Sequence, residues 1–185
     1  ALPILTIGLP SSSSVLVKRI YDAGVETFAF SDGTIKTNVD LIKAYFSKFS
    51  ASSDNTIYGF GSADVIDTLA GNDKIDAKEG NDTITGGAGA DTLTGGTGLD
   101  VFDYNAITES SKTVTDTITD FNTAQDMIDL RGLGFTGVAA GAAAGTKLGF
   151  TYDSAANDTI IVAASNFKVI MDGNKALDTS DFIFA

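Results

Sequence analysis

One large apolar residue returns every nine positions through the middle of the chain, each time two places after an aspartate. The apolar positions are Ile66, Ile75, Ile84, Leu93 and Phe102, and the aspartates are Asp64, Asp73, Asp82, Asp91 and Asp100. Side chains alternate between the two faces of a strand, so a three-residue strand centred on each apolar residue points one side chain inward and two outward. Such strands are too short to stand alone, and a constant period of nine predicts a solenoid of stacked coils.

The repeats span residues 50–103 and divide into six nonapeptides, of which the first is degenerate because Asn55 stands where the aspartate belongs. Each nonapeptide splits into a six-residue turn and a three-residue strand. Two nonapeptides then make one coil with a turn on each edge, and successive repeats face opposite sides of the solenoid. Half of the chain's 20 glycines lie in the last five nonapeptides, where the turns need positive-φ conformations.

The apolar pattern before the repeats predicts a small α/β unit over residues 1–49. Residues 14–20 and 26–34 are strand-like, and the second strand leaves through a turn at Asp32-Gly33. A helix is expected over residues 37–49, because its apolar positions fall on one side and Thr37 can cap its N-terminus. We interpret this unit as an N-terminal cap on the solenoid.

The nine-residue period is lost after residue 103. Strand-like segments separated by turn residues occupy residues 114–121, 126–130, 147–152, 158–163, 167–171 and 181–184. The Gly/Ala-rich run at residues 137–146 predicts a loop. We therefore expect residues 104–185 to form a β-rich domain that covers the last exposed coil.

Composition narrows the function classes. The formal net charge is −12, of which residues 1–49 contribute +1, residues 50–103 −8 and residues 104–185 −5. This balance disfavours nucleic acid and anionic membranes as partners, since both need a basic face. The chain has no Cys and no His, so disulfides, thiolate metal sites, HExxH zinc sites and Ser-His-Asp triads are excluded within it. No apolar run approaches the ~18 residues of a membrane span, and we identify no catalytic constellation.

The stacking of turns creates an electrostatic problem that points to a cation. Turns two repeats apart lie about 4.8 Å from one another, so their aspartates form ladders of like charge along both edges. At an effective dielectric constant near 20, each adjacent pair of carboxylates repels by about 3 kcal/mol. A dication between turns reverses the sign of that energy, and carboxylate oxygens with backbone carbonyls suit Ca²⁺. The sequence therefore predicts structural calcium in the repeats.

The array resembles the RTX (repeats-in-toxin, hemolysin-type) nonapeptide G-G-x-G-x-D-x-U-x. The best copies begin at Gly86-Gly87 and at Gly95-Gly96. The resemblance implies an all-β fold, a parallel β-roll with Ca²⁺ between its turns, flanked by the small N-terminal α/β cap and the β-rich C-terminal domain. The expected side-chain ligands are the five repeat aspartates already named. The expected backbone carbonyl ligands are those of Gly59, Gly61, Thr68, Ala70, Gly71, Ala77, Glu79, Gly80, Gly86, Ala88, Gly89, Gly95, Thr97 and Gly98.

Complete pairs of turns set the expected number of ions in the array. The pairs are residues 59–64 with 77–82, 68–73 with 86–91, and 77–82 with 95–100, which gives three sites. A fourth site would use the amide oxygen of Asn55 in the degenerate first turn. Asp82 is expected to matter most, because it alone among the array aspartates has a complete partner turn on both sides.

The resemblance extends to both flanks. Residues 26–41 look like the segment that interrupts long RTX arrays, and residues 98–133 are similar to the C-terminal region of serralysins and other type I-secreted proteins. The ending Asp181-Phe182-Ile183-Phe184-Ala185 resembles their secretion signal. The resemblance implies a calcium-binding module of a secreted bacterial protein, exported by a type I ABC exporter and folding on extracellular Ca²⁺. A polysaccharide-binding module of a secreted enzyme, or the terminal region of an adhesin or surface-layer protein, remains the alternative.

Carboxylates after the array stay open to two interpretations. The pairs Asp116/Asp120 and Asp126/Asp129 could do acid–base work or bind further calcium. Asp120 and Asp126 are accordingly additional candidate ligands, together with Asn55.

Overall fold

The computed structural model describes residues 20–22, 25–29, 35–37, 53–139 and 145–184. It divides the chain into two compact units, Ala1–Lys48 and Phe49–Ala185. None of the described residues forms a helix long and apolar enough to cross a lipid bilayer.

The first unit contains a three-stranded antiparallel sheet. Its strands are β1 (Ile20–Asp22), β2 (Val25–Ala29) and β3 (Ile35–Thr37), in the order β1-β2-β3. β2 overlaps the expected second strand at residues 26–29, and of the expected first strand only Ile20 is described. Thr37, the expected helix cap, is the last residue of β3, and the rest of that helix lies outside the described residues.

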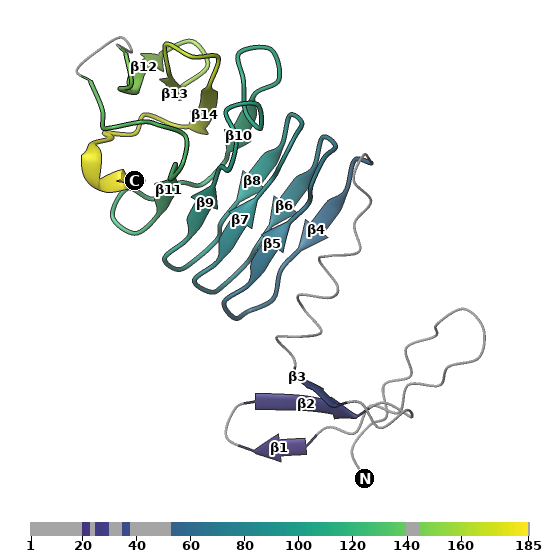
Figure 1. Ribbon diagram of the computed structural model, residues 1–185. Coiled ribbons are helices and arrows are strands. Elements are labelled where there is room, and N and C mark those ends of the chain that lie inside the picture. Colours follow the sequence, from purple (N-terminus) through teal and green to yellow (C-terminus); the bar gives the residue numbers. More distant parts are fainter. Residues whose placement is uncertain (1–19, 23–24, 30–34, 38–52, 140–144, 185) are drawn as a thin grey trace. The chain divides into compact units, whose positions relative to one another are not determined.

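The second unit is built on two parallel sheets whose strands alternate along the chain, so that β4 to β9 follow one another as successive rungs (Figure 1). The first sheet begins with β4 (Thr56–Tyr58), β6 (Lys74–Asp76), β8 (Thr92–Thr94) and β10 (Asp116–Ile118). The second sheet contains β5 (Val65–Asp67), β7 (Thr83–Thr85), β9 (Val101–Asp103), β11 (Met127–Asp129) and β15 (Phe182–Ile183). This alternation is the coil of two nonapeptides that the period predicts.

Two columns of apolar side chains, one from each sheet, run through the core of the roll. The register aligns Ile57, Ile75, Leu93, Ile118 and Met171 in the first column. It aligns Ile66, Ile84, Phe102, Ile128 and Phe182 in the second. All ten are buried, and burying one such side chain contributes about 1.5–3 kcal/mol. The expected inward column is confirmed, and it runs on past the repeats.

The C-terminal segment continues both sheets. β14 (Lys168–Asp172) pairs in parallel with β10, and β13 (Asp158–Val162) and β12 (Gly149–Asp153) extend that sheet as an antiparallel hairpin. The 3₁₀ helix η1 (Thr179–Asp181) leads into β15. Each of the six strand-like segments expected after residue 103 overlaps a strand. Neither sheet is interrupted there, and the division of the chain at residues 49 and 103 stays a prediction.

The sequence-based fold class is confirmed for the described residues, which form an all-β structure with a parallel β-roll. Of the expected C-terminal ending, residues 181–184 are described, and Asp181 and Phe182 are buried in this fold. Phe182 completes the second column, and its ring stacks on Phe184 with centroids 5.7 Å apart.

Candidate metal centre

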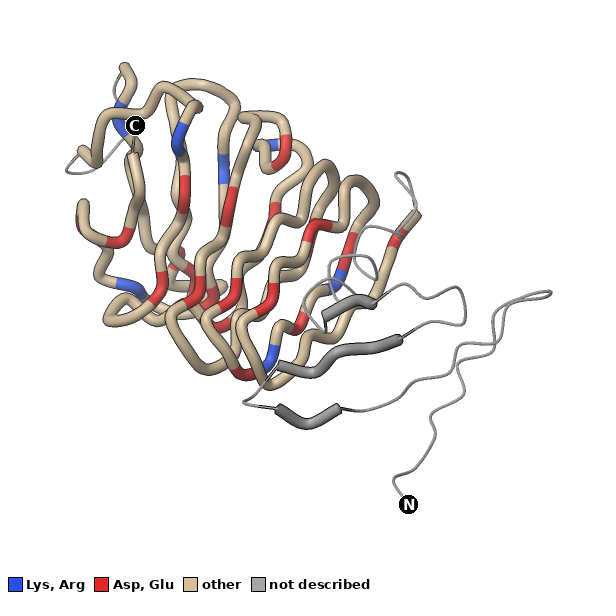
Figure 2. Tube along the Cα trace, turned by 60° about the horizontal axis from the view of Figure 1, so that its bottom comes forward, with Lys and Arg blue, Asp and Glu red and all other residues tan. Residues whose placement is uncertain are grey.

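The turns between strands line up along the two edges of the roll. We call turns 68–73, 86–91 and 104–116 edge A, and turns 59–64, 77–82, 95–100 and 120–126 edge B. Acidic residues recur from coil to coil across the roll, whereas basic residues are sparse (Figure 2). The sequence pattern therefore translates into rows of carboxylates at regular spacing.

Backbone hydrogen bonds fix one oxygen of each ladder carboxylate. On edge B, the Asp64 N–H donates to Asp82 Oδ1 at 2.7 Å, and the Asp82 N–H donates to Asp100 Oδ1 at 2.9 Å. On edge A, the Asp73 N–H donates to Asp91 Oδ1 at 2.8 Å, and the Asn55 N–H donates to Asp73 Oδ1 at 2.7 Å. The expected ladders are present, and the preceding coil holds the carboxylates of Asp73, Asp82, Asp91 and Asp100.

The second oxygen of these carboxylates is buried without a partner. Asp73, Asp82, Asp91 and Asp100 are each at most 2% exposed, and the Oδ2 atom of each accepts no hydrogen bond. Burial, with a smaller contribution from neighbouring ladder carboxylates, raises the pKa of Asp82 and of Asp91 to about 6. A buried carboxylate oxygen without a partner carries a desolvation cost, which a cation at that position would offset.

The turn backbone leaves no room for side chains against these oxygens. A Cβ at Gly86 would lie 2.4 Å from Asp91 Oδ2, and one at Gly95 would lie 2.5 Å from Asp100 Oδ2. Gly98 has a φ of +144°, and a Cβ there would lie 1.6 Å from the carbonyl oxygen of Gly80 in the turn below. Glycine is therefore required by close stacking as well as by positive φ.

The expected carbonyl ligands lie on these stacked turns. The carbonyls of Gly86, Ala88 and Thr97 each accept one hydrogen bond from the turn below, which leaves each a second lone pair. The remaining expected carbonyls, at the same turns, are those of Gly59, Gly61, Thr68, Ala70, Gly71, Ala77, Glu79, Gly80, Gly89, Gly95 and Gly98. No group of three acidic side chains converges among the described residues, so an ion on either edge would need such carbonyls.

The first turn of edge B differs from the others. Turns 68–73, 77–82, 86–91 and 95–100 each have positive φ at their second and fourth residues, whereas residues 59–64 have none. Instead, the Phe60 N–H donates to Asp64 Oδ2 at 2.6 Å, so Asp64 is partly satisfied by its own turn. Of the three expected turn pairs, 68–73 with 86–91 and 77–82 with 95–100 share one backbone shape, and 59–64 with 77–82 does not.

Both ladders continue beyond the repeats, which the sequence interpretation missed. The Asp91 N–H donates to Asp116 Oδ1 at 2.9 Å, and the Asp100 N–H donates to Asp126 Oδ1 at 3.2 Å. Asp91 and Asp100 therefore also have ladder aspartates on both sides, although Asp82 alone lies between two complete repeat turns, and its greater importance stays a prediction. The signal was available, because Asp116-Thr117-Ile118 and Asp126-Met127-Ile128 repeat the D-x-apolar spacing of the array.

The other candidate residues lie apart from the regular ladder positions or are already satisfied. Asp126 Oδ2 accepts the Asn122 N–H at 2.8 Å, so both of its oxygens have partners. Asp120 accepts the N–H groups of Gly95 and Gly96 at 2.9 and 2.7 Å, which caps the last repeat turn. The side-chain amide of Asn55 donates to the carbonyl of Ser53 within its own turn. The Arg131 side chain donates to the Asp129 carboxylate and lowers the pKa of Asp129. Asp129 is therefore paired with Arg131 and not with Asp126.

A second ladder, made of amides, was also missed. Asn72 Oδ1 accepts the Ala90 N–H at 2.9 Å, and Asn81 Oδ1 accepts the Leu99 N–H at 3.0 Å. These asparagines directly precede ladder aspartates, and their exposed side chains tie successive turns together. The Asn-Asp dipeptides of the repeats are the sequence signal for this role.

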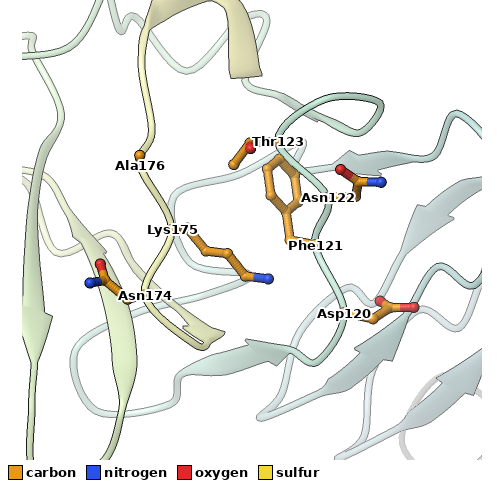
Figure 3. A pocket seen from close by; sticks show the side chains of 7 residues that line it. All are labelled: Asp120, Phe121, Asn122, Thr123, Asn174, Lys175 and Ala176. Atoms are coloured by element: carbon orange, nitrogen blue, oxygen red, sulfur yellow. The ribbon is translucent and has the colours of Figure 1, made fainter.

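A polar hollow of about 540 Å³ lies near the C-terminal end of edge B. Its walls are residues 120–123 and 174–176, and Figure 3 shows the Lys175 side chain extending from one wall toward the wall that carries Asp120. None of the buried oxygens without a partner belongs to its lining. We assign no ligand to this hollow.

Comparisons with known proteins place this geometry in context. Mannuronan C5-epimerase AlgE3 of Azotobacter vinelandii is 40% identical over 84 residues, which cover 41% of this chain and 4% of the epimerase. Mannuronan C5-epimerase AlgE2 of the same organism is 38% identical over 79 residues, covering 38% and 8%. The chain thus spans less than a tenth of the length of either epimerase.

Solved structures agree with the observed fold. The solution structure of the AlgE6R3 subunit of the Azotobacter vinelandii epimerase has a TM-score of 0.63 and 29% identity, covering 75% of this chain and 82% of that one. The AlgE6R2 subunit has a TM-score of 0.52 and 27% identity, covering 72% and 92%. The family model for the serralysin C-terminal region of M10 peptidases matches residues 7–184. Together with the RTX-type β-roll and its aspartate ladders, this match shows that the chain belongs to the peptidase M10 serralysin C-terminal family.

Proposed function

We propose that the chain is a calcium-folded RTX module that binds Ca²⁺ between successive turns on edges A and B. The observation that carries this proposal is that the two oxygens of each ladder carboxylate have different surroundings. One oxygen accepts a backbone N–H from the neighbouring coil, and the other is buried without a partner. The ligands would be that free oxygen and the turn carbonyls, an all-oxygen set of the kind Ca²⁺ takes.

The charge balance of the ladders supports the same conclusion. The ion pairs Lys78–Asp76 and Arg131–Asp129, formed within the described residues, involve no ladder aspartate of the repeats. The ladder carboxylates thus repel one another without a compensating side chain. Ca²⁺ bound only by the folded chain would stabilise it by RT ln(1 + [L]/Kd) per site, so calcium concentration would control folding.

The two turn pairs of uniform shape are the strongest sites. We place one ion between turns 68–73 and 86–91 and another between turns 77–82 and 95–100. The pair 59–64 with 77–82 is a weaker third site, because turn 59–64 lacks the positive-φ backbone shape of the other repeat turns, although Asp64 Oδ1 is also buried without a partner.

The biological setting follows from the family and the resemblance to RTX proteins. We propose a module of a secreted bacterial protein, unfolded at low cytosolic calcium, exported by a type I ABC exporter and folded outside the cell.

Circular dichroism with EDTA and then with Ca²⁺ tests the proposal, together with a calorimetric calcium titration. We expect β structure to form on calcium addition, and Asp82→Asn to need more calcium than the wild type. Asp76→Asn is the matched control, because Asp76 has the same charge but lies on β6 in an ion pair with Lys78. Calcium-independent spectra with no bound ion would contradict the proposal.

A polysaccharide-binding role is the second candidate, favoured by the likeness to mannuronan C5-epimerases. Tyr58 on β4 is 57% exposed, and Lys78 Nζ lies 5.1 Å from its ring centroid. An aromatic ring beside a lysine suits an acidic sugar. Titration with mannuronate oligomers, wild type against Tyr58→Ala, tests this role, and unmeasurable binding by the wild type would exclude it.

A further inference from the structure

The last turn of edge A differs in length from the repeat turns. Asp91 and Asp116 are 25 residues apart, whereas aspartates paired within the array are 18 apart, so turn 104–116 is seven residues longer. It lacks the Gly-Gly-x-Gly pattern. Even so, Asp116 takes the ladder position above Asp91, because β10 pairs in register with β8.

Asp116 is held rigidly at this position. Its Oδ1 atom accepts the Asp91 N–H at 2.9 Å, and its own N–H donates to Ser110 Oγ at 2.9 Å. Ser110 Oγ in turn donates to the backbone carbonyl of Lys168, which connects the long turn to β14. The side chain is completely buried, and its Oδ2 atom accepts no hydrogen bond.

Tyr104 brings a third oxygen to the same place. It occupies the first position of the turn, where the two preceding turns have Gly86 and Gly95, whose missing side chains would meet the carboxylate of their own aspartate. Its ring packs edge-on against Phe167 with centroids 5.4 Å apart. The hydroxyl is buried and makes no hydrogen bond of ordinary geometry, but it lies close enough to the Asp116 carboxylate to raise its own pKa and to lower that of Asp116. Burial raises the pKa of Tyr104 well above its usual value, and the charges of Asp116 and Asp91 raise it further.

On edge B, the aspartate that continues the ladder beyond the repeats has a hydrogen-bond donor that Asp116 lacks on edge A. There Asp126 follows Asp100 in the ladder, and the Asn122 N–H satisfies its second oxygen. On edge A no backbone N–H does this for Asp116. The burial of its side chain raises the pKa of Asp116 to about 8, the charge of Asp91 contributes to that rise, and no described lysine or arginine forms an ion pair with either aspartate.

We propose that Asp91, Asp116 and Tyr104 form a further cation site, outside the repeat motif, that takes a hard divalent ion of the Ca²⁺ type. The two free carboxylate oxygens supply the charge and the phenol supplies a neutral oxygen. The inference rests on the proposed function, since Asp91 also belongs to the array. It deepens that function by placing the last ion of edge A at the junction between the repeats and β14.

Terbium luminescence gives a direct test, because Tb³⁺ replaces Ca²⁺ and is sensitised by a tyrosine close to it. The chain has five tyrosines and no tryptophan, so the signal reports tyrosine proximity. We expect Tyr104→Phe, which keeps the ring against Phe167, to remove most of the sensitised emission. The matched control Tyr152→Phe alters an exposed residue of β12 and should keep it.

Calcium counting by native mass spectrometry provides the second measurement. We expect Asp116→Asn, which can still accept the Asp91 N–H, to bind one ion fewer than the wild type while keeping its β-rich spectrum in calcium. Unchanged emission in Tyr104→Phe and an unchanged ion count in Asp116→Asn would overturn the inference and leave the array sites standing. A wild type that binds neither Tb³⁺ nor Ca²⁺ would overturn the proposed function as well.

Discussion

The substitution Asp82→Asn should change the sign of its effect on stability between EDTA and calcium. In the structure Asp82 has Asp64 on one side and Asp100 on the other, and its Oδ1 atom accepts the Asp64 N–H. Asparagine keeps an oxygen for that hydrogen bond but removes the charge. The substitution therefore separates the two tasks of the carboxylate.

The expected magnitude without calcium comes from the repulsion within the ladder. Carboxylates one strand spacing apart, about 4.8 Å, repel by about 3 kcal/mol at an effective dielectric constant near 20. Asp82 has two such neighbours, and their charges add to burial in raising its pKa to about 6. Removing its charge should therefore stabilise the ion-free fold by about 3 kcal/mol or more at low salt, and by less at high salt.

In calcium the same substitution should destabilise the fold. At a calcium concentration about 1,000 times its Kd, loss of one site costs about 4.1 kcal/mol, which exceeds the repulsion of about 3 kcal/mol that the substitution relieves. Because the ion-free chain is expected to be largely unfolded, its stability is best measured as the midpoint of folding induced by an osmolyte in EDTA. Denaturant unfolding gives the corresponding value in calcium.

Asp76→Asn removes one charge from the exposed face of the roll and should change stability by less than about 1 kcal/mol under either condition. An equal loss of stability for Asp82→Asn in EDTA and in calcium would refute the reasoning. Such a result would mean that the carboxylate acts only as an acceptor for the backbone.

Three further predictions follow from the turns. Asp64→Asn should weaken calcium binding less than the same change in mid-ladder, because turn 59–64 lacks the positive-φ backbone shape of the other repeat turns; calorimetric titration checks this, and an equal loss would contradict it. In EDTA, low pH should favour folding, because the pKa of Asp91 is raised to about 6 and that of Asp116 to about 8 in the folded chain. The protonated carboxyl groups stabilise the fold at low pH, and this contribution is lost as pH rises through those values. Circular dichroism from about pH 4 to about pH 9 measures this, and folding favoured by alkali would oppose it. Gly98→Ala should destabilise the calcium-bound fold by about 3 kcal/mol, whereas Gly132→Ala should cost about 1 kcal/mol, because Gly132 has positive φ but open space around it. Denaturant unfolding compares the two variants, and equal costs would show that the stacked turns tolerate a side chain.

The repeat period predicted the part of the fold that is strictly local. Ile75 and Ile84 lie in different sheets because nine residues make half a coil, and this follows from the spacing alone. The ladders follow from the same spacing, since aspartates 18 residues apart must stack. Both the core columns and the ladder members within the array could therefore be read from the sequence.

The interpretation failed where the chain changes the length or the chemistry of a turn. The seven extra residues before Asp116 break the period but not the strand pairing, and pairing across a long loop has no local signal. Turn 59–64 has Ser62 where the regular turns have a positive-φ glycine, and its backbone follows a different course. The pairing of β14 with β10 depends on contacts about fifty residues apart in sequence, which periodicity cannot predict.

The most direct test of the central claim is a crystal structure of the chain with a lanthanide in place of calcium, with anomalous difference maps locating the ions. The account predicts peaks beside the free carboxylate oxygens between turns 68–73 and 86–91 and between turns 77–82 and 95–100. It also predicts that the Asp91 and Asp100 carboxylates contact these ions through Oδ2. A folded roll without an ion at either pair of turns would contradict the account.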